Sequence, residues 1–181
     1  MTTATANLES DHVHILRLTD VMEHITQSNE VNVEHLEIIV ELIRNFADGL
    51  HHNKEENLLF PKMVEKGFSF QQGPIAVMMH DHVQGRNYVK GMTEHIALYR
   101  AGHFGALAAI YENMTGYVNL LRAHIGKENN VLFRMADNTL SDDEQQNLLH
   151  EFKKVESNPV CGGYVSDCIR QIDNLASAYN M

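Results

Sequence analysis

The sequence HHNKEENLLF at residues 51–60 returns as HIGKENNVLF at residues 124–133, with six of the ten positions identical. In each copy a histidine lies four residues before a glutamate: His51 before Glu55, and His124 before Glu128. In a helix this spacing puts both side chains on one face, about 6 Å apart. A histidine beside a carboxylate among leucines is either a buried hydrogen bond or half of a metal site.

The second copy belongs to a regular hydrophobic pattern. Between residues 110 and 135, apolar residues recur with spacings that alternate between four and three. Two positions of this pattern are polar instead and hold His124 and Glu128. This spacing is typical of a helix that faces the centre of a bundle. It predicts one long helix over about residues 104–136, with both polar side chains pointing inward. The pattern consists of Ile110, Met114, Tyr117, Leu121, His124, Glu128, Val131 and Met135.

Helical patterns also cover about residues 10–27, 32–66, 74–101, 141–156 and 164–179. Ser10 is the expected N-cap of the first helix, Pro74 suits the first turn of the third, and Ser141 with Glu144 forms a capping-box signature. No convincing strand pattern is present. Four long helices with short connections predict an all-α, antiparallel up-down-up-down four-helix bundle, followed by one or two short C-terminal helices.

The repeat extends beyond the ten-residue phrase and predicts an internal duplication. Asp11-His12-Val13 recurs 70 residues later as Asp81-His82-Val83, and the longer phrase recurs after 73 residues. Each half of the bundle would therefore supply one histidine from its first helix, and a histidine with a glutamate from its second.

The six repeated polar residues suit two metal ions. Imidazole nitrogens bind first-row metals, and carboxylates can bridge two cations. Two glutamates, with an oxo or hydroxo bridge, would compensate the two metal charges. Six unpaired polar groups would be costly to bury in a bundle core without a shared partner, which favours a dinuclear site over separate structural hydrogen bonds. The predicted ligands are His12, His51, Glu55, His82, His124 and Glu128.

Composition narrows the class of protein. A chain of 181 residues is expected to form one domain. Its formal net charge of −10 argues against nucleic acid or an anionic membrane as the main partner. There is no apolar run of transmembrane length and no secretory signal pattern, so a cytoplasmic protein is expected. Two cysteines, Cys161 and Cys168, are too few for a disulfide scaffold, and two unpaired thiols are favoured over a redox pair.

These motifs resemble the hemerythrin-like family, also called the HHE cation-binding domain. The resemblance covers roughly residues 8–136. It implies a single hemerythrin-like domain over residues 1–181, with its core at 8–136 and a C-terminal helical extension at 137–181. It also implies a non-haem di-iron centre that reacts with oxygen, nitric oxide or peroxide. The motifs are Asp11-His12, His51-x-x-x-Glu55-Glu56 before Leu59-Phe60-Pro61, Asp81-His82-x-x-Gly85-Arg86, and His124-x-x-x-Glu128 before Leu132-Phe133.

One departure separates this sequence from the oxygen-carrying hemerythrins. Those proteins carry two histidines one turn apart on the third helix, whereas Met78 and Arg86 occupy the positions four residues from His82 here. The resemblance therefore implies a symmetric set of four histidines and two glutamates. That set is more similar to the iron-centre repair (RIC-type) proteins than to the oxygen carriers.

Three classes of function remain open at this point. The favoured one is reaction of a di-iron site with nitric oxide, peroxide or oxygen, in stress defence or iron-centre repair. The alternatives are reversible oxygen or nitric oxide binding for sensing or transport, and iron storage or donation without turnover. The same ligands serve all three. Whether the protein is an enzyme, and its oligomeric state, stay undecided.

Several neighbouring side chains receive weaker interpretations. His52 is expected on a solvated face, and Lys54 and Lys127 are expected to be solvated. Arg86 either orients a carboxylate near the site or packs at the surface. Tyr117 is expected to belong to the core.

Overall fold

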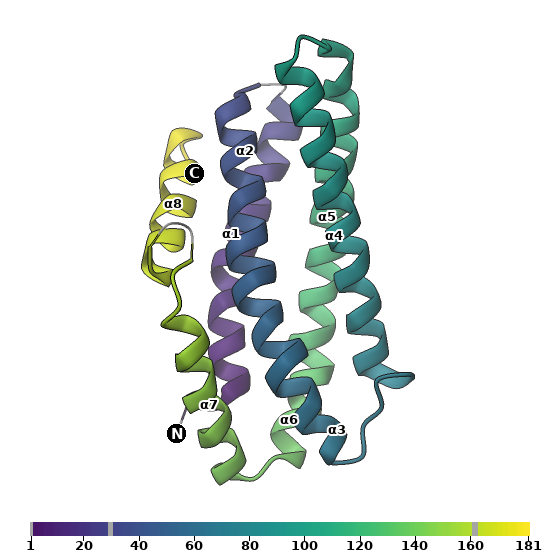
Figure 1. Cartoon of the computed structure of the whole chain (residues 1–181), viewed down its shortest axis with the longest axis vertical. Helices are drawn as coiled ribbons and strands as arrows, with labels where there is room; N and C mark the ends of the chain where they lie inside the picture. The colour runs from purple at the N-terminus through teal and green to yellow at the C-terminus, as the bar shows by residue number, and fades with distance from the viewer. Residues whose placement is uncertain (1, 29–30, 161–162) are drawn as a thin grey trace.

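The computed structural model describes residues 2–28, 31–160 and 163–181, and it is helical almost throughout (Figure 1). The strand-like structure within these residues is an isolated bridge between Val160 and Gly163. In chain order the elements are α1 (Ala4–Ser28), α2 (Val33–Leu42), η1 (Ile43–His52), η2 (Glu55–Leu59), α3 (Phe60–Glu65), α4 (Gly73–Arg100), η3 (Phe104–Ala106), α5 (Leu107–Lys127), η4 (Glu128–Leu132), α6 (Phe133–Thr139), α7 (Asp142–Glu156) and α8 (Val165–Ala178).

Four long helices form an antiparallel up-down-up-down bundle (Figure 1). The second runs from α2 through η1 and η2 to α3, and the fourth runs from α5 through η4 to α6, because the backbone between these elements stays in the right-handed helical region. The shorter α7 and α8 pack along α1, beside the bundle. The predicted bundle with two short C-terminal helices is confirmed.

Local signals in the sequence set most of the helix ends. The Asn32 side chain accepts a hydrogen bond from the His35 backbone and caps α2, and Ser141 with Glu144 forms the predicted capping box of α7. Gly67 and Gly102 follow the second and third long helices with φ of +100° and +93°, which glycine adopts without strain. The prediction for Ser10 is wrong: α1 already begins at Ala4, so Ser10 lies inside the helix.

Three π-helical segments, η1, η2 and η4, interrupt the second and fourth long helices. A π turn hydrogen-bonds over five residues instead of four, so it rotates the residues that follow. Leu132 at the end of η4 and Phe133 directly after it are buried, whereas Val131 and Met135 are 50% and 37% exposed. The inward orientation predicted for Val131 and Met135 is therefore wrong, while the pattern up to Glu128 holds.

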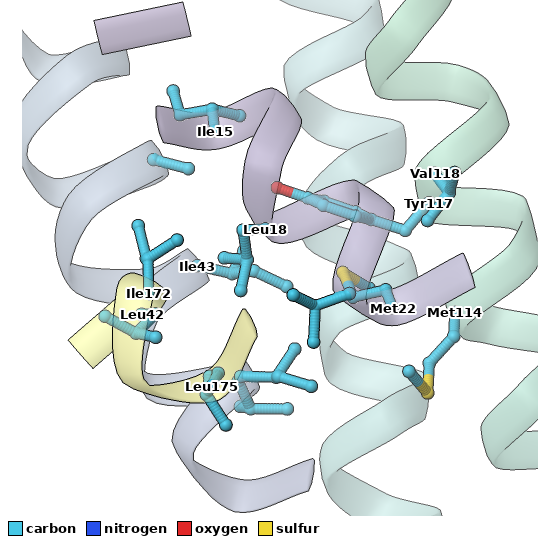
Figure 2. Packing of buried hydrophobic residues seen from close by; sticks show 14 of the residues in the cluster. Ile15, Leu18, Met22, Leu42, Ile43, Met114, Tyr117, Val118, Ile172 and Leu175 are labelled. Atoms are coloured by element: carbon cyan, nitrogen blue, oxygen red, sulfur yellow. The ribbon is translucent and has the colours of Figure 1, made fainter. Parts of the chain in front are cut away.

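Two apolar clusters fill the bundle. Between them lies a polar layer that contains the six residues predicted as ligands. Figure 2 shows part of the larger cluster, where side chains such as Leu18, Leu42 and Leu175 meet from α1, α2 and α8. The smaller cluster includes Leu8 and Phe60. On three of the long helices, the residues predicted as ligands lie between the stretches that belong to the two clusters, and on the fourth Ile125 of the larger cluster lies between His124 and Glu128. The polar layer is therefore enclosed by hydrocarbon at both ends.

Cys168 is fully buried and takes part in a disulfide, so the prediction of a free thiol is wrong for this residue. Cys161 lies outside the described residues. None of the described helices combines the length and the apolar character needed to cross a lipid bilayer.

Candidate metal centre

The six residues predicted as ligands come together in the polar layer. Each side chain is at most 2% exposed. His12 comes from α1 and His82 from α4, whereas each His–Glu pair comes from the second or fourth long helix, where η2 or η4 starts at the glutamate itself. The residues that face one another are His12, His51, Glu55, His82, His124 and Glu128.

The four histidines form two facing pairs. Nε2 of His12 lies 3.0 Å from Nε2 of His51, and Nε2 of His82 lies 3.2 Å from Nε2 of His124. Two imidazole nitrogens that bind one metal at about 2.1 Å and at right angles would be about 3 Å apart. Each pair thus has the spacing of two neighbouring ligands of one ion.

Each glutamate reaches both histidine pairs. Glu55 extends Oε1 to 3.7 Å from Nε2 of His51 and Oε2 to 3.5 Å from Nε2 of His82. Glu128 extends Oε1 to 3.1 Å from Nε2 of His124 and Oε2 to 3.3 Å from Nε2 of His12. This is the geometry of carboxylates that bridge two cations, one oxygen to each.

The four glutamate oxygens are buried and have no hydrogen-bond partner among the described residues. Burying a carboxylate without a partner is expensive, and such groups are rare in folded proteins. Imidazoles and carboxylates are together a donor set for iron, zinc or manganese. The residues therefore fit metal ions, which would supply the partners that these oxygens lack.

A hydrogen-bond acceptor fixes the outer nitrogen of every predicted histidine ligand. Nδ1 of His12 donates to the Asn129 side chain at 2.8 Å, and Nδ1 of His51 donates to Asp11 at 3.1 Å. In the other pair, Nδ1 of His82 donates to Glu56 at 2.7 Å, and Nδ1 of His124 donates to Asp81 at 3.3 Å. With the proton on Nδ1, the lone pair of Nε2 faces the centre. Such outer acceptors orient metal-binding imidazoles and increase their basicity.

His52 is also part of this layer, and the prediction of a solvated His52 is wrong. Its side chain is buried, and its ring stacks on His82 with centroids 3.8 Å apart and planes 17° apart. Its Nδ1 donates to Asp48 at 3.1 Å. His52, Glu55, His82 and His124 all offer ligand atoms within 4.8 Å of one another. Two rings that bind one metal normally point their nitrogens toward the same ion, whereas the His52 and His82 rings lie nearly parallel, face to face. His52 therefore shields one face of the His82 ring and is not placed as a further ligand.

Of the charged residues around the site, Lys54 differs from the prediction. Lys54, expected in solvent, is fully buried and bonds Asp11 at 2.7 Å. Lys127 is 42% exposed and pairs with Asp81. Arg86 bonds both Asp48 and Glu56, so it orients carboxylates next to the site, as one of its two interpretations proposed.

Burial and the neighbouring charges shift the acidity of these groups strongly. Burial, with the adjacent Glu128 carboxylate, raises the pKa of Glu55 well above its usual range. Burial lowers the pKa of His51 to about 4 and that of His52 to about 3. For His124 burial also acts downward, but Glu128 and Asp81 outweigh it and raise the pKa to about 9. The layer is thus unfavourable for the free Glu55 carboxylate, whereas the neighbouring His124 and His12 outweigh burial and lower the pKa of Glu128 well below its usual range.

A cavity of about 160 Å³ opens beside His82 and His124. Its walls are mostly apolar, and the charged Asp48, Arg86 and Lys90 also line it. Tyr117, which belongs to the core as predicted, contributes its ring to the wall. His12 and His51 do not line this cavity, so it serves one histidine pair. The uncharged part of the wall, apart from the histidines, consists of Ile43, Gly85, Val89, Tyr117, Leu120 and Leu121.

The chain is similar in sequence to known metal-binding proteins. The model of the Hemerythrin HHE cation binding domain matches residues 3–136. An iron-sulfur cluster repair protein (YtfE) of Musicola paradisiaca is 37% identical over 90 residues, which are 48% of this chain and 40% of that protein. The proteins of the same name from Yersinia pestis and Yersinia pseudotuberculosis are 38% identical over the same lengths. The chain therefore aligns with less than half of these relatives. No solved structure matches it.

Proposed function

Because the chain belongs to the hemerythrin HHE cation-binding family, we propose that it holds two iron ions and reacts with small oxidants. His12 and His51 would bind one ion, and His82 and His124 the other. Glu55 and Glu128 would bridge them. The reactants would be nitric oxide, peroxide or oxygen, in defence against oxidative or nitrosative stress.

One observation carries the dinuclear proposal: each glutamate directs one oxygen to each histidine pair, and none of the four oxygens has a hydrogen-bond partner within the described part of the chain. A structural His–Glu hydrogen bond would satisfy one oxygen and leave the other exposed or paired elsewhere. A single metal ion would leave two of the four oxygens without a partner.

When bound, the iron pair would supply one-electron redox chemistry and coordination positions for a small molecule. The chain's own residues would control access and orientation. The cavity beside His82 would admit a small molecule, and the charged side chains of Asp48, Arg86 and Lys90 in its lining would orient a polar one. His52 covers one face of His82 and is neutral near pH 7, because burial keeps its pKa low.

The dinuclear proposal is tested by metal content. Protein expressed with ample iron should contain about two iron atoms per chain by elemental analysis. Well-folded protein with one metal ion or none would overturn the proposal. Zinc or manganese in place of iron would leave the site geometry standing, because this donor set does not choose strictly among these metals.

Reactivity is tested by adding each oxidant in turn to the reduced protein without air. We expect rapid oxidation by oxygen, and reaction with nitric oxide or decomposition of peroxide. An oxygen-dependent spectrum that lasts for hours and reverses under vacuum would instead favour carriage or sensing.

The relatives support a second candidate, iron donation to damaged iron–sulfur clusters, because the proteins matched over 90 residues carry the name of cluster repair proteins. Iron-loaded protein would then restore activity to an enzyme with a depleted cluster, whereas variants Glu55→Ala and Glu128→Ala would not. Restoration by an equal amount of free ferrous ion at the same rate would argue against donation. The cytoplasmic location remains a prediction.

A further inference from the structure

Lys54 lies in an unusual place for a lysine. Its side chain is fully buried, and its ammonium group sits 5.4 Å from the centre of the Phe152 ring of α7. Buried lysines need several partners to offset the loss of water. Lys54 has three: Asp11 at 2.7 Å, Asn7 at 2.8 Å and Glu156 at 3.0 Å.

These contacts join the C-terminal extension to the metal centre. Glu156 at the end of α7 contacts Lys54, and Lys54 contacts Oδ2 of Asp11. The same Oδ2 accepts the hydrogen bond from Nδ1 of His51. The contacts therefore run without a gap from residue 156 to His51, which the proposed function assigns as an iron ligand.

We propose that Lys54 and Glu156 are positioning residues for the metal centre: Lys54 holds the Asp11 carboxylate against Nδ1 of His51, and Glu156 holds Lys54. The C-terminal extension thereby acts on one half of the site. This inference rests on the proposed di-iron function and adds a residue outside the matched range 3–136 to the machinery that tunes it.

The second half of the duplication provides the contrast. Lys127 contacts Asp81, and Asp81 accepts from Nδ1 of His124, so the arrangement repeats. Lys127 is nevertheless 42% exposed, and Asp81 is its one ion-pair partner in the described part of the chain. Water and salt would screen this pair far more than the buried one. The extension therefore makes the two chemically similar halves unequal.

Charge gives the direction of the effect. Asp11, Lys54 and Glu156 together carry one net negative charge next to His51. Replacing Glu156 by glutamine removes that net charge and leaves Lys54 to act on Asp11 alone. Asp11 then accepts less strongly from His51, the imidazole donates less to the metal, and the ferrous state is favoured over the ferric state.

The experiment compares reduction potentials and iron affinity of the full chain and its variants. Glu156→Gln should shift one of the two reduction steps to a higher potential. Glu151→Gln, on the same helix and paired with Lys154 at the surface, should leave both steps unchanged. Lys54→Met should weaken binding of one iron by about 10-fold, a typical loss for outer partners of metal ligands. Lys127→Met should have a smaller effect.

Other results would overturn the inference. Wild-type potentials in Glu156→Gln would do so, and so would two tightly held irons with unchanged potentials in Lys54→Met, even at a lower melting temperature, because Lys54 would then be purely structural. If Lys54→Met does not fold, the Glu156→Gln comparison still decides. Wild-type protein that holds no iron would overturn the proposed function itself, and the inference with it.

Discussion

The buried carboxylates of Glu55 and Glu128 affect the free energy of unfolding more than any other part of the proposed site. Glu55→Gln should make the metal-free protein more stable at pH 7, because the amide carries no charge to bury. The same variant should lose most of the stability that iron adds. Urea unfolding with and without iron measures both effects.

Glu112→Gln is the matched control, because Glu112 is exposed on α5. Neither value should change for it. A metal-free Glu55→Gln protein less stable than the wild type would mean that the Glu55 carboxylate already has a good partner without metal.

His51 and His52 predict an acid-sensitive metal-free protein. Their folded-state pKa values, about 4 and about 3, lie below the usual 6.5, so the unfolded chain binds more protons between these values. Stability should therefore be present above pH 6.5 and fall as the pH drops toward 4, by up to about 1.4 kcal/mol per pH unit for each histidine. Urea unfolding at pH 7, 5.5 and 4.5 tests this expectation.

His52→Leu should flatten that pH dependence, whereas His80→Ala, at an exposed position of α4, should not. Equal slopes in both variants and the wild type would show that other groups control the acid limb.

At the scale of the element, the π-helical segments set the direction of the side chains that follow them. Deleting the exposed Asn130 should convert η4 to α-helix and turn Leu132 and Phe133 away from the smaller cluster. We expect a loss of at least about 3 kcal/mol in the free energy of unfolding, comparable to removing a buried aromatic side chain. Asn130→Ala keeps the chain length and should change little.

The same segments explain which sequence predictions succeeded. The helices, the capping box at Ser141 and the inward pattern up to Glu128 follow from local signals and were predictable. The burial of His52 and the exposure of Val131 were not, because a straight α-helical register has no place for an extra residue. Lys54 could not be predicted either, since its partners lie far away in sequence, at Asn7 and Glu156.

For the whole molecule, the metal ions would join two hydrophobic clusters that the polar layer keeps apart. Each ion at 100 times its dissociation constant adds about 2.7 kcal/mol, so two should raise the melting temperature by roughly 10 °C or more. Calorimetry of metal-free protein against protein with two equivalents of ferrous ion, without air, measures the rise. Glu128→Ala should abolish most of it; a full rise in that variant would place the stabilising metal elsewhere.

The internal duplication could be predicted from the sequence, because the repeated candidate ligands and their spacing indicate two similar helical hairpins that face each other. The six ligand candidates do come together, although their role as ligands remains a prediction. The contribution of the C-terminal helices was hidden, because nothing in residues 137–181 repeats a motif of the bundle.

The π segments also carry a record of ancestry. In both copies of the ten-residue phrase the segment covers the same five positions, Glu55–Leu59 and Glu128–Leu132. One insertion, made before the sequence doubled, accounts for both, whereas two separate insertions at one matching place require a coincidence. Each half of the duplication is a helical hairpin with two histidines and one glutamate. Such a hairpin holds half of the proposed ligand set, so one half by itself would need a second copy to complete it.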